Sequence, residues 1–468
     1  MNRREFIGGM AAGLATAKAA VSALKTSSQT PQPSMFRYRG YLGWITDLAT
    51  NANTYATWPS MNLDEALLSD YQRTFALMKN LGFNAAVIWG FYVSRAWPVD
   101  IASAGTKQRG AMVERLIDLA HSYGLKVYTG LGVYSWGFEE IIHANPNLAR
   151  TNPKAMCGSL PEAWEWMRKV TDFAITRFPV DGVSMQSADQ GRCDCNQCRR
   201  YTDTEYHARL DIRVSEYIRS RWPDKTLAVS GWGMDLSDPE SQPHLVNLSK
   251  HINYLIDVPD SSRRRDPAYR RTLTKALQCS FGTIGGPQVE PPQHWARDRW
   301  FLPTAKNQGE HLAGLREDGG DACEYFFHIL ANPGDEVSFH VAGKLLSDPA
   351  TTWQRHLQTT IESLYHTGGA RTGDLMELFV QAEEAYLKNF PDMRSGTIAM
   401  EPLFGDSPGP PLYLTKHFSS EQRKEYRIAI DHISAGFLKI AGDVPEKNRV
   451  QNIIRCLQNA KKDLDSVS

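Results

Sequence analysis

A short apolar run at residues 180–186 leads into a segment with several groups that can do chemistry. Gln186 closes the run, Asp189 follows in a Ser-Ala-Asp-Gln-Gly stretch, and Cys193, Cys195 and Cys198 come next. In α/β proteins a strand is rigid and the loop after it can reach a ligand, so strand ends commonly carry the chemistry. We therefore expect this strand end to be the heart of the active face.

The three closely spaced cysteines form a motif of their own. Cys193-x-Cys195-x-x-Cys198 presents soft ligands at spacings that a structural zinc accepts, with Cys157 or His207 as a fourth ligand. An exported chain can instead hold these residues in disulfides. Both alternatives stay open, and both favour a structural role over a catalytic thiol.

Carboxylates lie in or after several predicted strands. Asp189 is the first candidate catalytic residue because it lies in the polar stop after a strand. Glu324 is the second, because it lies in an apolar run and a glutamate is rarely buried without a partner or a function. Asp257 and Asp235 are reserves. Two carboxylates can divide acid–base work when their surroundings raise the pKa of one and keep the other ionised.

Each of these carboxylates also has a structural interpretation. Asp189 could hold a turn or cap a helix, since Asp favours such places. Glu324 could pair with Lys or Arg inside the sheet. The residues after Asp257 and Asp235 favour a turn at both positions.

Aromatic side chains accompany the carboxylates. Trp89, Tyr92, Trp136 and Trp232 lie at or just after predicted strand ends, as does Gln186. Indole and phenol faces stack well on the C–H faces of sugar rings, so we expect these residues to orient a carbohydrate. The alternative for each tryptophan is that its side chain fills the core at the rim of the barrel and does not contact sugar.

Alternating strands and helices must position these groups. Such alternation favours a parallel sheet, and eight units favour closure as a (β/α)8 barrel, which we place at residues 36–335. From 336 to 468 the pattern becomes helical, so we expect a C-terminal helical domain. The expected strands cover residues 38–44, 84–89, 126–131, 181–186, 227–230, 252–256, 279–284 and 322–327.

The first residues predict export. Arg3-Arg4 precedes a mildly apolar run of small residues, and residues 1–23 resemble a bacterial twin-arginine signal peptide. A polar linker at 24–35 follows. We expect a periplasmic or secreted protein with no membrane insertion after signal removal. Lys plus Arg and Asp plus Glu both total 52, so the net charge points to no nucleic-acid partner.

The block at residues 181–198, together with Met-Cys-Gly-Ser-Leu-Pro-Glu at 156–162, resembles a group of bacterial glycoside-hydrolase-like barrels. These barrels are loosely similar to α-glucuronidases and β-N-acetylhexosaminidases. The resemblance covers residues 36–390 in the order of elements, and it implies a carbohydrate site at the end of the fourth strand. This chain departs from the hexosaminidases, because Ala188-Asp189-Gln190 stands where they carry a paired Asp-Glu.

These observations predict an exported glycoside hydrolase that cleaves an oligo- or polysaccharide with a carboxylate acid–base mechanism. The predicted reaction requires no cofactor, and a structural zinc is the one metal that the motifs suggest. Two alternatives remain: a non-catalytic carbohydrate-binding protein, and a metal-dependent lyase or isomerase that acts on a sugar. The sequence makes no prediction of oligomeric state.

Overall fold

The computed structural model describes residues 35–45, 63–91, 107–258, 267–285, 300–326, 333–389 and 418–467. The chain from Met35 on forms one compact unit. The predicted signal peptide and linker, up to residue 34, and Tyr92 lie outside the described residues. None of the described helices combines the length and the apolar character that crossing a membrane requires.

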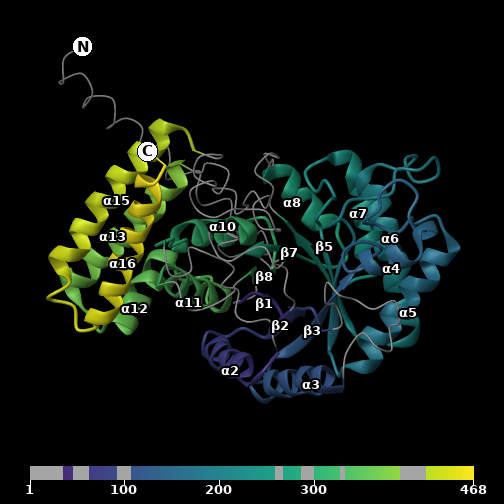
Figure 1. Cartoon of the computed structure of the whole chain (residues 1–468), viewed down its shortest axis with the longest axis horizontal. Helices are drawn as coiled ribbons and strands as arrows, with labels where there is room; N and C mark the ends of the chain where they lie inside the picture. The colour runs from purple at the N-terminus through teal and green to yellow at the C-terminus, as the bar shows by residue number, and fades with distance from the viewer. Residues whose placement is uncertain are drawn as a thin grey trace, which may run out of the picture. The chain divides into compact units, whose positions relative to one another are not determined.

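Eight parallel strands close into a barrel in sequence order, which confirms the predicted fold class (Figure 1). Each strand pairs with the next along the chain, and β1 closes the ring by pairing with β8, with Gly40 opposite Glu324. The strands are β1 Tyr38–Trp44, β2 Ala85–Trp89, β3 Lys126–Gly132, β4 Gly182–Gln186, β5 Thr226–Ser230, β6 Tyr254–Asp257, β7 Ser280–Gly285 and β8 Ala322–Phe326.

Helices form the outer layer of the barrel. Asp64 caps α2 by accepting a hydrogen bond from the Leu67 N–H, and Thr202 caps α6 in the same way through Glu205, so local sequence sets where these helices begin. The outer helices are α2 Glu65–Asn80, α3 Lys107–Ser122, α4 Glu139–Ala144, α5 Pro161–Arg177, α6 Asp203–Arg221, α7 Gln242–Ser249, α8 Pro267–Ala276 and α10 Ala305–Glu317.

Strand alternation divides the buried side chains into two clusters. Inward-facing residues such as Leu42, Val87 and Ile256 fill the barrel, and outward-facing residues such as Val183 and Leu255 pack under the helices. Because the side chains of a strand alternate, this division tells which candidate residues face the barrel axis.

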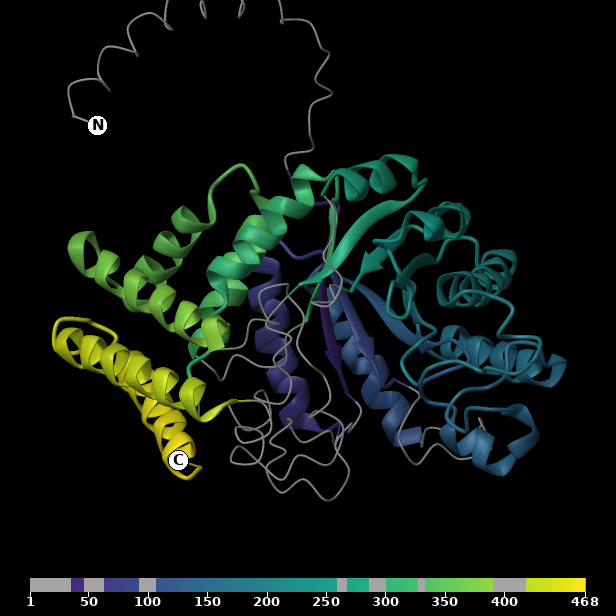
Figure 2. The same cartoon turned by 90° about the horizontal axis from the view of Figure 1, so that it is seen from above.

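The C-terminal region is helical, as predicted. Its helices are α11 Pro333–Ser347, α12 Trp353–Tyr365, α13 Gly369–Asn389, α15 Ser420–Ile440 and α16 Lys447–Asp465. In Figure 2, α15 and α16 run side by side, and α15 also packs on α13. The buried Trp300 indole N–H donates to Asp463 of α16 over 2.9 Å, which ties the last helix to the segment before α10.

The expected boundary between barrel and helical domain, at residues 335 and 336, falls within α11. This helix follows β8 and packs on β1 and α10, so it is the outer helix that follows the last strand of the barrel. The division of the chain into two domains stays a prediction.

Gly130 of β3 gives a test of the barrel interior. A Cβ atom added there would collide with the Trp89 indole, which lies over the glycine. We expect Gly130→Ala to lower the free energy of unfolding by about 1–3 kcal/mol, because the indole must leave its packed position. Urea unfolding followed by circular dichroism measures the change. Gly442→Ala is the control, since nothing lies within 4 Å of its added Cβ; equal midpoints for both variants would contradict this packing.

Candidate active site

The turn after β4 is held from the outer layer of the barrel. The Ser187 hydroxyl donates to the buried Asp211 of α6 over 3.0 Å, and His207, one turn earlier on the same helix, bonds to the Ser187 backbone. Burial lowers the pKa of His207 to about 4 and raises that of Asp211 well above its usual range. His207 is therefore neutral near pH 7, and burial likewise disfavours the charged form of Asp211.

The same turn closes on itself. The Gly191 N–H donates to the Ala188 carbonyl over 2.8 Å, and Gly191 has a φ of 77°, a left-handed conformation that favours glycine. The Asn152 amide donates to the Gln190 carbonyl over 2.7 Å. These contacts fix the backbone on both sides of Asp189.

Asp189 lies at the carboxyl end of the barrel with its carboxylate oriented by two amides. Gln186 donates to Oδ1 and Gln190 donates to Oδ2, each over 3.2 Å. The side chain is half-buried, and Gln186 faces the barrel axis as the last residue of β4. The structure therefore brings two of the predicted site residues, Asp189 and Gln186, into direct contact.

Loops that carry tryptophans flank this turn on both sides. Ser135, beside Trp136 in the loop after β3, accepts a hydrogen bond from the Gln190 N–H over 2.8 Å. Gly233, beside Trp232 in the loop after β5, lies so close to Ala188 that a Cβ would collide with it. Both indoles are half-buried, and Trp232 belongs to neither apolar cluster.

The loop after β3 is strained where it meets the site. Tyr134 and Trp136 have φ values of 60° and 42°, in the left-handed region that residues with side chains rarely adopt. Such conformations persist only where the surroundings enforce them, and they concentrate at functional sites. The strain places Trp136 edge-to-face on Trp89, with ring centroids 4.8 Å apart.

Trp89 itself occupies the position of a core residue. It is only 4% exposed and packs within the cluster that fills the barrel. Trp89 was predicted to stack on a sugar, but the structure places it in the core, which was the alternative for each tryptophan. Trp136 covers it.

Glu324 lies inside the barrel and not at its mouth, which corrects its expected position. It is 2% exposed, and its Oε1 accepts hydrogen bonds from the Tyr38 hydroxyl at 3.0 Å and the Ser184 hydroxyl at 3.3 Å. Leu42 and Phe326, the next inward-facing residues on β1 and β8, lie one layer nearer the mouth. Burial raises the pKa of Glu324 to about 7.

The two candidate catalytic carboxylates, Asp189 and Glu324, nevertheless both contact side chains of β4. Glu324 contacts Ser184 and Asp189 contacts Gln186, which are successive inward-facing residues of β4. Such residues are about 7 Å apart along a strand. The two acids are therefore stacked at different depths along β4 and do not face one another across an opening.

The reserve carboxylates, Asp257 and Asp235, have other surroundings. Asp257 ends β6 two residues after the outward-facing Leu255, so alternation turns its side chain away from the barrel axis. Asp235 Oδ1 accepts hydrogen bonds from the Ser237 N–H and hydroxyl at 2.9 and 2.6 Å, the turn that the sequence favoured.

Four cysteine sulfurs gather beside the Asp189 turn. The Sγ atoms of Cys157, Cys193, Cys195 and Cys198 all lie within 4.8 Å of one another, and no other group of three or more potential metal ligands occurs among the described residues. Cys157 Sγ is 3.8 Å from that of Cys195 and 3.7 Å from that of Cys198. All four are free thiols. Cys157, and not His207, completes the group.

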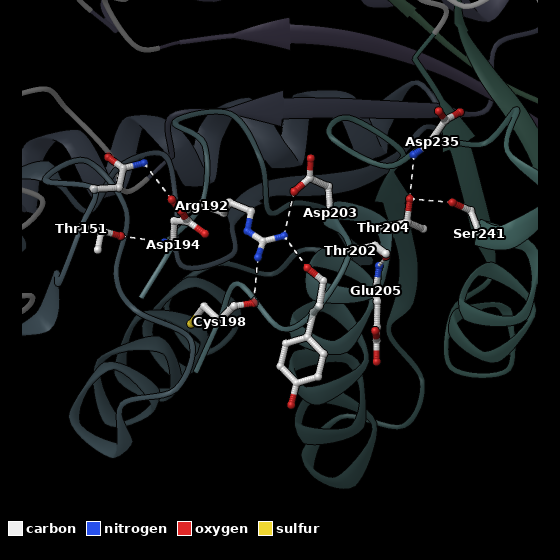
Figure 3. Close-up of polar contacts among 12 residues, drawn as sticks. Thr151, Arg192, Asp194, Cys198, Thr202, Asp203, Thr204, Glu205, Asp235 and Ser241 are labelled. Atoms are coloured by element: carbon white, nitrogen blue, oxygen red, sulfur yellow. Dashed lines mark hydrogen bonds and ion pairs between the residues drawn. The ribbon is translucent and has the colours of Figure 1, made fainter. Parts of the chain in front are cut away.

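The sulfur cluster and the start of α6 are joined by an arginine that the sequence analysis did not single out. Figure 3 shows Arg192 between the Cys198 carbonyl and the Asp203 carboxylate, and it donates to each over 2.7 Å. Its guanidinium also stacks on Tyr206. In the same view, Thr204 Oγ1 accepts from the Asp235 N–H, so the helix start also holds the loop after β5.

His207 and Asp211 are further residues whose supporting role the sequence analysis missed. The available signal was their spacing, since residues four apart on a helix share a face. In the structure, the face of α6 that carries His207 and Asp211 is directed at the β4 turn.

Comparisons with known proteins bear on the fold. No family model and no curated protein matches this chain. Among solved structures, a mutant of the O-GlcNAc hydrolase from Thermobaculum terrenum is similar, with a TM-score of 0.51 and 12% identity over 92% of this chain and 83% of the other. The chain thus shares the barrel fold of a glycoside hydrolase, and at this identity the likeness concerns the fold alone.

The raised pKa of Glu324 gives a pH-dependent prediction. Between pH 4.5, the ordinary pKa of glutamate, and about 7, the folded chain holds a proton that the unfolded chain has released, so stability falls as pH rises. Glu324→Gln keeps an acceptor for Tyr38 and Ser184 but cannot titrate. From pH 4.5 to about pH 8, we expect its free energy of unfolding to gain about 3 kcal/mol relative to the parent.

Urea unfolding at both pH values measures this gain. Exposed Glu317, changed to Gln, is the control for the loss of a carboxylate outside the barrel interior. A gain no larger than that of the control would show that Glu324 is not held neutral in the folded barrel.

Proposed function

We propose that this protein is a glycoside hydrolase whose working carboxylate is Asp189. The observation that carries the proposal is the position of this side chain. Asp189 lies at the carboxyl end of a barrel strand, oriented by two amides, between loops that carry Trp136 and Trp232. A fixed carboxylate between two loops that carry tryptophans suits the protonation of a glycosidic oxygen or the activation of water at a sugar ring.

Each neighbour has a role in this proposal. Gln186 and Gln190 hold the carboxylate in one orientation, which keeps it aimed at a bound substrate. Trp136 and Trp232 stack on sugar rings on either side of the reacting bond. Glu324, below the mouth, accepts a hydrogen bond from Ser184 and so supports β4 without contact with the substrate. The similarity in fold to an O-GlcNAc hydrolase supports a carbohydrate substrate.

The depth of Glu324 favours a second candidate function, a carbohydrate-binding protein without turnover. Glycosidases generally use two carboxylates beside the scissile bond. Among the described residues, Glu324 is buried below the mouth, Asp257 turns away from the barrel axis, and Asp235 bonds within its own turn. The mouth of the barrel would then keep Trp136 and Trp232 and bind sugar only.

Asp189→Asn distinguishes the two functions. The full chain is first screened against chromogenic glycosides and plant, algal and host glycans. For a hydrolase, we expect Asp189→Asn to lower kcat by about 10²–10⁴-fold while sugar binding by calorimetry persists. Asp224→Asn, an exposed residue before β5 at the opposite end of the barrel, should leave kcat unchanged. Sugar binding by the parent with no product from any glycan would favour the binding protein.

We also propose that the chain is exported by the twin-arginine route. Arg3-Arg4 and the small apolar residues after them support this proposal. Replacing both arginines by lysine should retain the protein in the cytoplasm, as measured by cell fractionation and immunoblotting in a bacterial host. Lys25→Gln, in the predicted linker, should leave export intact. Equal export of both variants would contradict the proposed route.

A further inference from the structure

We propose that Cys157, Cys193, Cys195 and Cys198 bind one structural Zn²⁺ ion. Zinc–sulfur bonds of about 2.3 Å at tetrahedral angles place pairs of sulfurs about 3.8 Å apart. The sulfur of Cys157 is 3.8 and 3.7 Å from those of Cys195 and Cys198, and all four sulfurs lie within 4.8 Å of one another. Four soft ligands at this spacing enclose a tetrahedral ion.

The chemistry around the sulfurs suits four thiolates. The Ser159 hydroxyl lies 3.0 Å from Cys157 Sγ, and the Thr151 hydroxyl lies 3.5 Å from Cys193 Sγ. The Arg150 guanidinium approaches Cys195 Sγ at 3.9 Å. Hydroxyl and guanidinium donors stabilise the negative charge that four thiolates leave on a zinc centre.

A disulfide explains this arrangement less well. A disulfide joins two sulfurs at about 2.05 Å and leaves no reason for a third and fourth to converge on the same point. The sulfurs of Cys195 and Cys198 lie at nearly the same distance from that of Cys157, and all four lie within 4.8 Å of one another, as ligands of one ion do. Because all four positions would be filled by protein, the ion would have no open site for substrate, so its role is structural.

The ion would join two segments that are distant in the sequence and both touch the Asp189 turn. Cys157 comes from the segment before α5, where Asn152 bonds to the Gln190 carbonyl and the Met156 N–H donates to the Tyr134 carbonyl. The other three ligands lie between the turn and α6. The metal would therefore act as a cross-link that fixes the Asp189 turn relative to the strained loop after β3.

Metal content tests this inference without reference to the reaction. The full chain, purified without chelator and analysed by inductively coupled plasma mass spectrometry, should contain about one zinc per molecule. Cobalt substitution should give the visible bands of a tetrahedral thiolate site. Cys157→Ser and Cys198→Ser should each lower bound zinc at least tenfold, while Cys279→Ser, outside the cluster, should retain it.

Thiol titration covers the case in which the cysteine variants fail to fold. The parent, unfolded in the presence of chelator and without reductant, should show seven reactive thiols, because zinc keeps the four cysteines reduced. Three reactive thiols and no metal would mean two disulfides and would overturn the proposal. Bound iron in place of zinc would overturn the assigned ion. Any of these results leaves the proposal about Asp189 intact.

Discussion

The pairing of β1 with β8 is the interaction on which the rest of the structure depends. It brings Tyr38 beside Ala322 and Gly40 beside Glu324, so the first and last strands of the sheet become neighbours. A closed ring leaves no strand edge unpaired, and it directs the carboxyl ends of all eight strands to one face. Residues more than two hundred positions apart can meet at that face only because the ring closes.

Closure also creates an interior that must be filled. Gly130 leaves room for the Trp89 indole, and Trp136 covers that indole from the mouth. Glu324 shares this interior with Tyr38 and Ser184, which satisfy its oxygen without a counter-charge. Holding an acid there raises its pKa to about 7. The barrel thus carries a titratable group in its core, at a cost in stability above neutral pH.

Three different parts of the barrel support the Asp189 turn. The outer helix α6 holds it through Ser187, the segment before α5 holds it through Asn152, and the loop after β3 holds it through Ser135. A zinc-bound cysteine cluster would lock two of these supports together. Such a rigid surround is what an oriented carboxylate needs, since small displacements of a reacting group cost large factors in rate.

The sequence by itself determined the barrel and the helical tail, and it predicted the site that we propose at the β4 end. Alternating apolar runs and amphipathic segments are local patterns that report strand and helix directly, and the Cys-x-Cys-x-x-Cys spacing needs no fold to be seen. Only the tertiary structure decided which acids reach the mouth. Glu324, Asp257 and Trp89 each follow a sequence pattern that fits a site residue, yet strand register and alternation place them in the core or on the outer face. The choice of Cys157 over His207 was settled in the same way, because chain packing and not spacing sets which distant residue meets a loop.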